Sequence, residues 1–152
     1  MEIRLATEKD LPTLINMGRV MHEESNFRDL PFDERVTTET LRGLIRSRTG
    51  CVWLADSNEH TMGAIGGQLS RAFFSQEAVA EDKFLFVRPQ YRGVKLRVTD
   101  ELLRHFCMWA AENGARRITI CNSAGAPDDL FTKKLGRYGF QVAGSVMFME
   151  VG

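Results

Sequence analysis

The feature that most restricts the fold is a strand pattern, a long helix pattern and a second strand pattern in direct succession between residues 83 and 121. Residues 83–87 predict a strand that stops at Pro89, because proline has no N–H to donate to a sheet. Apolar residues at helical spacing then predict a helix from about residue 94 to residue 113. Residues 117–121 predict a short buried strand. Neighbouring parallel strands need such a crossover, so the segment indicates a right-handed β–α–β unit.

The rest of the chain alternates between the same two patterns. Strands are expected near residues 3–5, 51–56 and 61–71, and helices over residues 11–24, 41–50 and 127–139. Gly63, Gly66 and Gly67 are expected to loosen the third of these strands and to mark a bulge. The tail, residues 140–151, is rich in β-forming residues, with a turn expected at Gly144 and Ser145. The pattern predicts one domain over residues 1–152, of the α/β (α+β) class, with helices flanking a sheet that is partly antiparallel and partly parallel.

Charge and apolar segments exclude several classes of function. Lys and Arg together number 20, as do Asp and Glu, so the charge gives no support for nucleic acid or a membrane surface as a partner. No apolar run approaches the ~20 residues that span a bilayer, and the N-terminus lacks the apolar core of a signal peptide. A cytoplasmic protein is therefore expected.

Cysteines and histidines are scattered, without the spacing of a metal site. They are Cys51, Cys107 and Cys121, and His22, His60 and His105. The cysteines are odd in number and lie in apolar stretches, which favours reduced, buried thiols over a disulfide framework. No metal site is expected.

The loop of residues 87–96 joins a strand end to the start of the longest predicted helix. The first N–H groups of a helix have no partner within the helix, and the helix dipole adds partial positive charge, so a pyrophosphate is favoured there. Gly93 would let the backbone approach a phosphate closely, and Arg92 and Lys95 add charge. An ordinary strand-to-helix turn with exposed basic residues is the alternative, and the loop alone does not decide between the two.

Gln90, Arg92 and Gly93 resemble the acetyl-CoA signature of the GNAT superfamily of N-acetyltransferases, whose motif Gln/Arg-x-x-Gly-x-Gly/Ala stands at this junction. The likeness covers nearly the whole chain and includes residues 4–14, residues 109–120 and the pair Gly139-Phe140. The resemblance implies a GNAT-like mixed sheet with a splayed strand pair that holds acetyl-CoA as cosubstrate.

Two positions depart from the GNAT pattern. Lys95 stands where the family has a small Gly or Ala; its N–H and ammonium would suit the phosphates, whereas its long side chain would crowd them. Leu135 stands where many members carry a Tyr that protonates the departing CoA thiolate. Tyr138, nearly one helical turn further on, is the remaining candidate for that acid.

The resemblance also implies the groups that contact the cosubstrate. The pantetheine arm would bond to backbone groups near Phe86 and Val87, and the phosphates would lie against Arg92, Gly93, Val94, Lys95 and Leu96. Asn122 is expected either to touch the pantetheine or to cap the loop before the last helix. Phe131 is expected in the core, with packing on the CoA arm as the alternative.

A general base is required, because an amine attacks a thioester only in its neutral form. Glu81 lies six residues before Val87, on the same face of a regular strand, and matches the position of a family general base. Asp82 is the second candidate and points to the opposite face. For both residues, a solvated strand entry is the alternative.

The acceptor site is expected between the first helix, the loop after it and the glycine-containing strand. Its polar candidates are His22, Glu23, Glu24 and Arg28, whose acidic members suit a cationic amine. The resulting hypothesis is an N-acetyltransferase that moves an acetyl group from acetyl-CoA to a primary amine of a small molecule or protein. The alternative is a catalytically inactive acyl-CoA-binding or protein-interaction module with the same fold. A homodimer is compatible with the sequence.

Overall fold

The computed structural model describes residues 1–58, 60–93, 97–122 and 128–151. Its strands are β1 (Glu2–Leu5), β2 (Gly50–Asp56), β3 (Thr61–Arg71), β4 (Ala78–Val87) and β5 (Ala115–Thr119). Its α-helices are α1 (Leu11–Glu24), α2 (Glu34–Arg46), α3 (Val98–Glu112) and α4 (Asp128–Gly136), and single 3-10 turns lie at Glu8–Asp10 and Pro89–Tyr91. None of these helices is long and apolar enough to cross a membrane.

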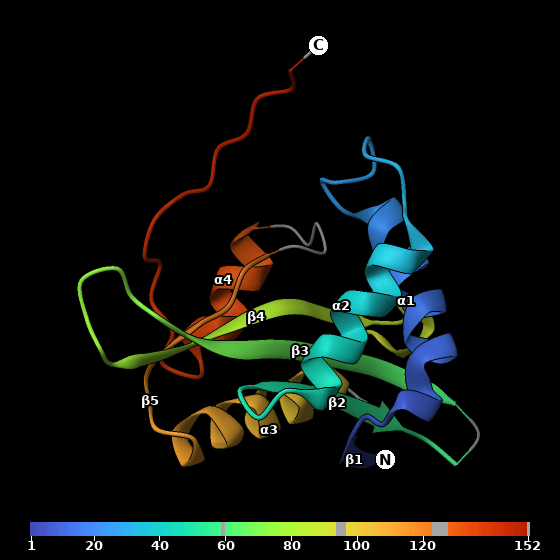
Figure 1. Ribbon diagram of the computed structural model, residues 1–152, viewed down its shortest axis with the longest axis horizontal. Coiled ribbons are helices and arrows are strands. Elements are labelled where there is room, and N and C mark those ends of the chain that lie inside the picture. Colours follow the sequence, from blue (N-terminus) through green and yellow to red (C-terminus); the bar gives the residue numbers. More distant parts are fainter. Residues whose placement is uncertain (59, 94–96, 123–127, 152) are drawn as a thin grey trace.

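The strands form one mixed sheet in the order β1-β2-β3-β4-β5 (Figure 1). The first three pairs are antiparallel, and β4 and β5 are parallel. Helix α3 connects β4 to β5, so the predicted β–α–β unit and the mixed sheet are confirmed.

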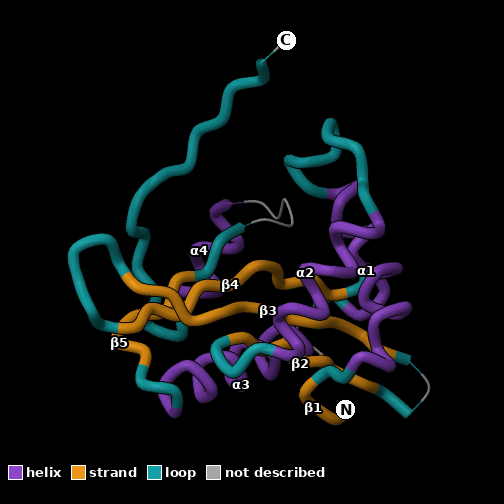
Figure 2. The backbone as a smooth tube through the Cα atoms, in the orientation of Figure 1, coloured by secondary structure: helices purple, strands orange, loops and turns teal. Residues whose placement is uncertain are grey.

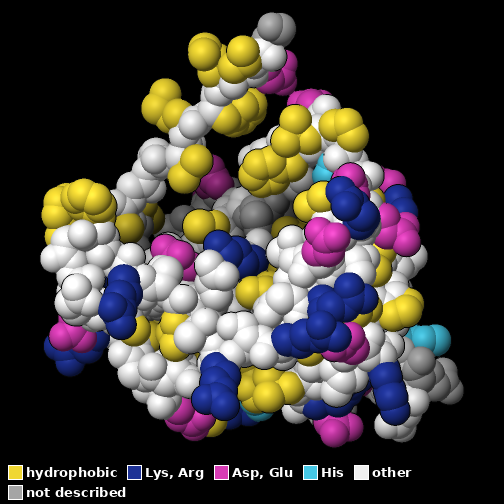
Figure 3. All heavy atoms as spheres, viewed as in Figure 1, with side chains coloured by type: hydrophobic (Ala, Val, Ile, Leu, Met, Phe, Trp, Pro, Cys, Tyr) yellow, Lys and Arg dark blue, Asp and Glu magenta, His cyan; other side chains and the backbone are white. Residues whose placement is uncertain are grey.

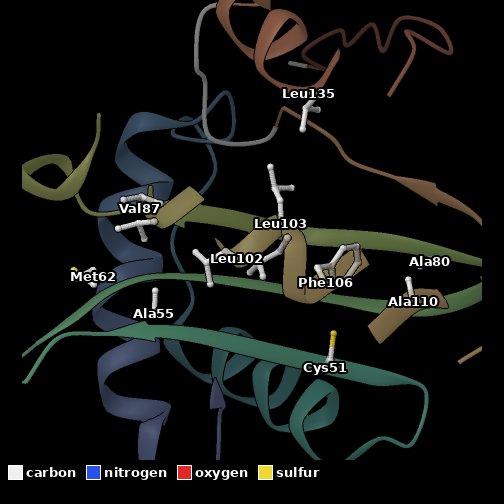
Figure 4. Packing of buried hydrophobic residues seen from close by; sticks show 12 residues of the cluster. Cys51, Ala55, Met62, Ala80, Val87, Leu102, Leu103, Phe106, Ala110 and Leu135 are labelled. Carbon is white, nitrogen blue, oxygen red and sulfur yellow. The ribbon is translucent and has the colours of Figure 1, made fainter. Parts of the chain in front are cut away.

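Helices cover both faces of the sheet, with a hydrophobic cluster on each. Ala64 and Ile65 of β3 are neighbours and therefore point to opposite faces. Ala64 packs in the cluster of α1 and α2, and Ile65 in the cluster of α3. Figure 4 shows the second cluster, in which Leu103 of α3 and Leu135 of α4 point toward each other.

A bulge interrupts the β3–β4 ladder at the predicted glycines. Gly66 is paired with Phe84 and Gly67 with Asp82, so Lys83 has no opposite residue. A Cβ on Gly67 would lie 2.5 Å from the Glu81 carbonyl oxygen and 2.6 Å from the Phe106 ring. Glycine is required here because the two strands and α3 approach too closely for any side chain.

Two helix starts differ from the prediction. Helix α3 begins at Val98 and not near residue 94, because Arg97 has a left-handed backbone (φ 50°, ψ 24°) through which a helix cannot run. Helix α2 begins at Glu34, well before the expected residue 41, because the Asp33 carboxylate accepts a hydrogen bond from the Val36 N–H and caps it.

The last part of the chain also departs from the prediction. β5 was expected to be buried, but Arg116 and Arg117 are exposed, because no described strand covers its outer edge. Residues 140–151 form no strand, so the predicted strands of the tail are wrong. In Figure 1 this segment runs away from the body of the protein. A strand forms only against a neighbour, and the tail pairs with none in the described chain.

Candidate active site

The parallel strands β4 and β5 separate near the middle of β4. Their ladder runs from Ala78 and Ala115 to Glu81 and Thr119, whereas β4 continues to Val87 beside β3 alone (Figure 2). The splayed strand pair that the sequence predicted is therefore present. The end of the ladder, at Glu81 and Thr119, is called the fork below.

Asp82 is the buried acidic group at the fork. Asp82 is only 7% exposed, and its Oδ1 accepts a hydrogen bond of 2.8 Å from the Cys121 N–H. Its Oδ2 is buried and has no hydrogen-bond partner among the described residues. Burial raises the pKa of Asp82 to about 6, although the Cys121 N–H favours the charged form. A carboxyl group that changes charge near pH 6 is suited to taking a proton at neutral pH.

Glu81 does not share a face with Val87, contrary to the prediction. Ala80 and Val87 pack in the same cluster although they are seven residues apart. In a regular strand, an odd spacing would place them on opposite faces, and the bulge at Lys83 reverses the alternation. Glu81 therefore points away from the face of Ala80 and Val87, whereas Asp82 lies on that face.

Arg92 is held by groups of the protein itself. Its Nε donates to the Val87 carbonyl oxygen at 2.7 Å, and its guanidinium pairs with Glu24 at the end of α1. The guanidinium carbon lies 5.3 Å from the centre of the Phe86 ring. These contacts fix the loop after β4 to α1, and they occupy the Val87 carbonyl, one of the backbone groups expected to bind pantetheine. A phosphate contact for Arg92 stays a prediction.

Gly93 has a backbone that favours glycine, with φ at +127°. Apart from its chain neighbours, no atom of the described residues lies within 4 Å of the position that a Cβ would take there. The loop is thus open at Gly93, as a close approach to a phosphate would need. Val94, Lys95 and Leu96, the other predicted phosphate contacts, lie outside the described residues.

Helix α4 and the turn after it bear on the predicted acid. Leu135 is buried in the core, 7% exposed, so no acid stands at this position. Tyr138 lies near the Asp100 carboxylate in the first turn of α3. Burial and this carboxylate raise the pKa of Tyr138 to about 12, which makes it a weaker acid than an ordinary tyrosine.

Two further predicted residues flank α4. Asn122 donates from Nδ2 to the Asp128 carboxylate at 2.8 Å, which ties the end of β5 to the first residue of α4. This is a bond between two side chains, whereas a cap accepts a bond from a backbone N–H, so both roles expected for Asn122 stay predictions. Phe131 is half-buried and packs against the core, as expected.

The acceptor side contains an apolar cavity of about 390 Å³. Its walls are α1, residues 25–33, the start of α2 and the inner face of β4. His22 lines it, and His22 Nε2 lies 2.7 Å from the Leu30 carbonyl oxygen. Glu23 and Arg28 are exposed and do not line it, and Glu24 is paired with Arg92. Of the four predicted acceptor residues, the structure brings only His22 into this cavity.

The aromatic walls of the cavity were not predicted from the sequence. Phe84 and Phe86 come from β4, and Phe27 and Phe32 from the segment between α1 and α2. The available signal was the recurrence of apolar residues in that segment, which is too irregular to indicate a helix or a strand.

Metal and thiol chemistry receive no support from the described residues. No group of three or more His, Cys, Asp or Glu side chains among them is arranged to hold a metal ion. Cys51 is buried, and burial raises the pKa of its thiol to about 12. Cys121 is exposed, against the expectation of three buried thiols, because it follows the uncovered strand β5.

Comparison with known proteins places the fold. No protein-family model matches the sequence, and no curated protein is significantly similar to it. Among solved structures, a probable acetyltransferase is 21% identical, with a TM-score of 0.75 over 100% of this chain and 97% of the other. A transcriptional regulator from Bacillus halodurans C-125 is 17% identical, with a TM-score of 0.78 over 99% of both chains. AAC(6')-Iy in complex with the bisubstrate analogue CoA-S-monomethyl-acetylneamine is 16% identical, with a TM-score of 0.72 over 99% of this chain and 97% of the other.

These matches define the protein as an α/β domain with an acetyltransferase-type fold. The mixed sheet flanked by helices that the sequence predicted is therefore shared with these structures.

Proposed function

We infer that the protein transfers an acetyl group from acetyl-CoA to a primary amine. The observation that carries this proposal is Asp82, a buried carboxyl group with a pKa of about 6 at the fork of a GNAT fold. A buried ionisable group with one unpartnered oxygen costs stability, so it is more readily explained by chemistry than by folding.

The proposed reaction uses a single direct attack. The amine nitrogen forms a bond to the thioester carbonyl carbon, and the carbon–sulfur bond then breaks. Asp82 Oδ2 accepts the proton that the amine loses through a chain of water molecules, because Oδ2 is buried on the α3 face of β4 and the cavity lies on the opposite face. Backbone N–H groups at the end of β4 would stabilise the negative charge on the carbonyl oxygen during the attack. The CoA thiolate leaves and takes a proton from solvent, because Leu135 supplies none and Tyr138 is too weak an acid.

The residues available for the cosubstrate fit a phosphate-bearing molecule. The backbone is open at Gly93, and Arg92 supplies positive charge at the same loop. Because Arg92 is paired with Glu24 and the Val87 carbonyl, binding of acetyl-CoA would exchange at least one of these contacts for a phosphate or pantetheine group. The proposal assigns Phe86, Val87, Arg92 and Gly93 to the cosubstrate.

A second candidate function is binding without catalysis. Leu135, at the position of the acid in the resembling family, is a core side chain without an acidic proton. Burial and the Asp100 carboxylate raise the pKa of Tyr138. These two observations favour an acyl-CoA-binding or protein-interaction module that keeps the fold and has lost the chemistry.

Substitution at the fork distinguishes the two functions. Asp82→Asn keeps an oxygen for the Cys121 N–H but removes the base, so acetyl transfer should fall about 100-fold or more. Wild-type kcat/KM should rise with pH through about 6, where Asp82 loses its proton, and the variant should lack this rise. Glu81→Gln is the matched control and should leave turnover and the pH profile little changed. Turnover is measured by the release of CoA thiol and by the mass of the acetylated amine.

Wild-type turnover in Asp82→Asn would remove Asp82 from the mechanism. Binding of acetyl-CoA without transfer to any amine would favour the non-catalytic module.

A further inference from the structure

The apolar cavity beside β4 has a composition that selects among amines. Its lining consists mainly of aliphatic and aromatic side chains, including Met17, Met21, Phe32, Phe84 and Phe86. A volume of about 390 Å³ falls within the usual range for small-molecule sites. Ligand sites of this kind combine apolar walls with a few polar groups, and here the polar groups are few.

The acidic and hydroxyl side chains at the cavity are engaged by the protein, and Lys83 adds a positive charge to its lining. The Asp33 carboxylate caps α2 through the Val36 N–H at 3.0 Å. Ser25 Oγ donates to the His22 carbonyl oxygen and accepts from the Phe27 N–H. The cavity therefore has no cluster of uncommitted acidic groups among the described residues that line it. A ligand with several positive charges would lose hydration there and gain no opposite charges in return.

The cavity also reaches the end of β4 at which the cosubstrate loop begins. Phe86 is 3% exposed; its side chain forms part of the cavity wall and lies beneath the Arg92 guanidinium. A ligand in the cavity would thus have one end directed toward the loop that the proposed function assigns to acetyl-CoA.

We propose that this cavity holds the apolar part of the acceptor, which is a monoamine carried on an aromatic ring or a short alkyl chain. This inference rests on the proposed acetyl transfer for the word acceptor, but not for the binding itself. It also separates this protein from acetyltransferases whose acceptors are polycations: neamine and spermidine should be poor acceptors.

Gly18 of α1 lines the cavity, so a larger side chain at this position would fill part of it. A Cβ at Gly18 would make ordinary contacts with the Thr37 methyl at 3.7 Å and the Phe32 ring at 3.8 Å. Leucine also favours a helix more than glycine does. Gly18→Leu should therefore fold and occupy part of the cavity. Gly43→Leu in α2 is the matched control, because Gly43 is helical and does not line this cavity. Beyond the nearby backbone of α2, no atom of the described residues lies within 4 Å of an added Cβ.

The test combines calorimetric binding with turnover, using 2-phenylethylamine, hexylamine, spermidine and neamine as probes. We expect 2-phenylethylamine and hexylamine to bind, and kcat/KM for them to exceed that for the polycations by about tenfold or more. Gly18→Leu should weaken the binding of 2-phenylethylamine about tenfold, whereas Gly43→Leu should leave it unchanged.

Each outcome decides between the two claims. If 2-phenylethylamine binds to the wild type, binds more weakly to Gly18→Leu and is not acetylated, the cavity inference holds. The proposed acetyl transfer to this amine then fails. If spermidine or neamine is acetylated better than 2-phenylethylamine, acetyl transfer holds and the cavity inference is overturned. Absence of 2-phenylethylamine and hexylamine binding, or equal binding of 2-phenylethylamine to Gly18→Leu and wild type, also overturns the cavity inference.

Discussion

At the scale of single residues, Asp82 connects the chemistry to the stability of the fold. A carboxyl group with a raised pKa in the folded state binds a proton more tightly there than in the unfolded chain. Asp82 therefore stabilises the folded protein fully below about pH 4, and this contribution is lost as the pH rises through about 6. Ionisation of Asp82, the proposed base, therefore lowers the stability of the folded protein.

Substitution of Asp82 should remove that pH dependence. The wild-type free energy of unfolding should fall between pH 4 and pH 8 by roughly 3 kcal/mol more than that of Asp82→Asn, at about 1.4 kcal/mol per pKa unit. Urea unfolding at the two pH values measures this difference, and Glu81→Gln should behave as wild type. An identical pH dependence in Asp82→Asn and wild type would mean that the fork leaves the Asp82 pKa near its ordinary value.

Some single residues were predictable from the sequence, and others were not. The acidic pair at Glu81 and Asp82 was visible as a candidate base. Which of the two is buried depends on the bulge at Lys83 and on the Cys121 N–H, 39 residues further along the chain. Contacts over such separations leave no periodic signal in the sequence.

At the scale of elements, the glycine bulge in β3 determines how β4 presents its side chains. Gly67 lies opposite Asp82 and beneath Phe106 of α3. The bulge was predicted from the glycines, and the bounds of β3 agree with the expected residues 61–71. Its consequence for the faces of Glu81 and Val87 was missed, because the prediction assumed a regular strand.

A side chain at Gly67 should therefore damage both the fold and the site. Gly67→Ala places a methyl group against the Glu81 carbonyl oxygen, which is a backbone atom and cannot move aside by a change of rotamer. The substitution should therefore destabilise the protein by about 1–3 kcal/mol or more. Gly43→Ala, in open space on α2, should stabilise it by up to about 1 kcal/mol. Thermal unfolding of both variants tests this, and equal melting temperatures would contradict the close packing at the bulge.

At the scale of the whole molecule, the tail beyond Phe140 is exposed, whereas Phe140 itself packs against the core. Val146 is 93% exposed and Met147 is 91% exposed, and residues 140–151 form no strand. Figure 3 shows hydrophobic side chains along this segment, away from the body of the protein. The sequence predicted strands there from β-propensity, which reports a fit to a half-buried surface and supplies no partner strand. The β–α–β unit and the mixed sheet, by contrast, were predicted, and the short connections from β2 to β3 and from β3 to β4 favour neighbouring antiparallel strands. A cytoplasmic location and a homodimer stay predictions.

Removal of the tail should leave the fold intact. Deletion of residues 142–152 should change the free energy of unfolding by no more than about 0.5 kcal/mol, because exposed side chains away from packed contacts contribute little. The deletion should also reduce self-association at high protein concentration, since it removes exposed apolar surface. A large loss of stability would show instead that the tail packs against the sheet in solution.

The central claim is that the fork and its loop bind acetyl-CoA, and the most direct test is ligand-dependent thermal stability. Acetyl-CoA and CoA at about 100 times their Kd should each stabilise the folded protein by roughly 2.7 kcal/mol, whereas ATP at the same concentration should not. We expect a clear upward shift of the melting temperature with both CoA compounds and none with ATP. No shift with acetyl-CoA, or an equal shift with ATP, would contradict it.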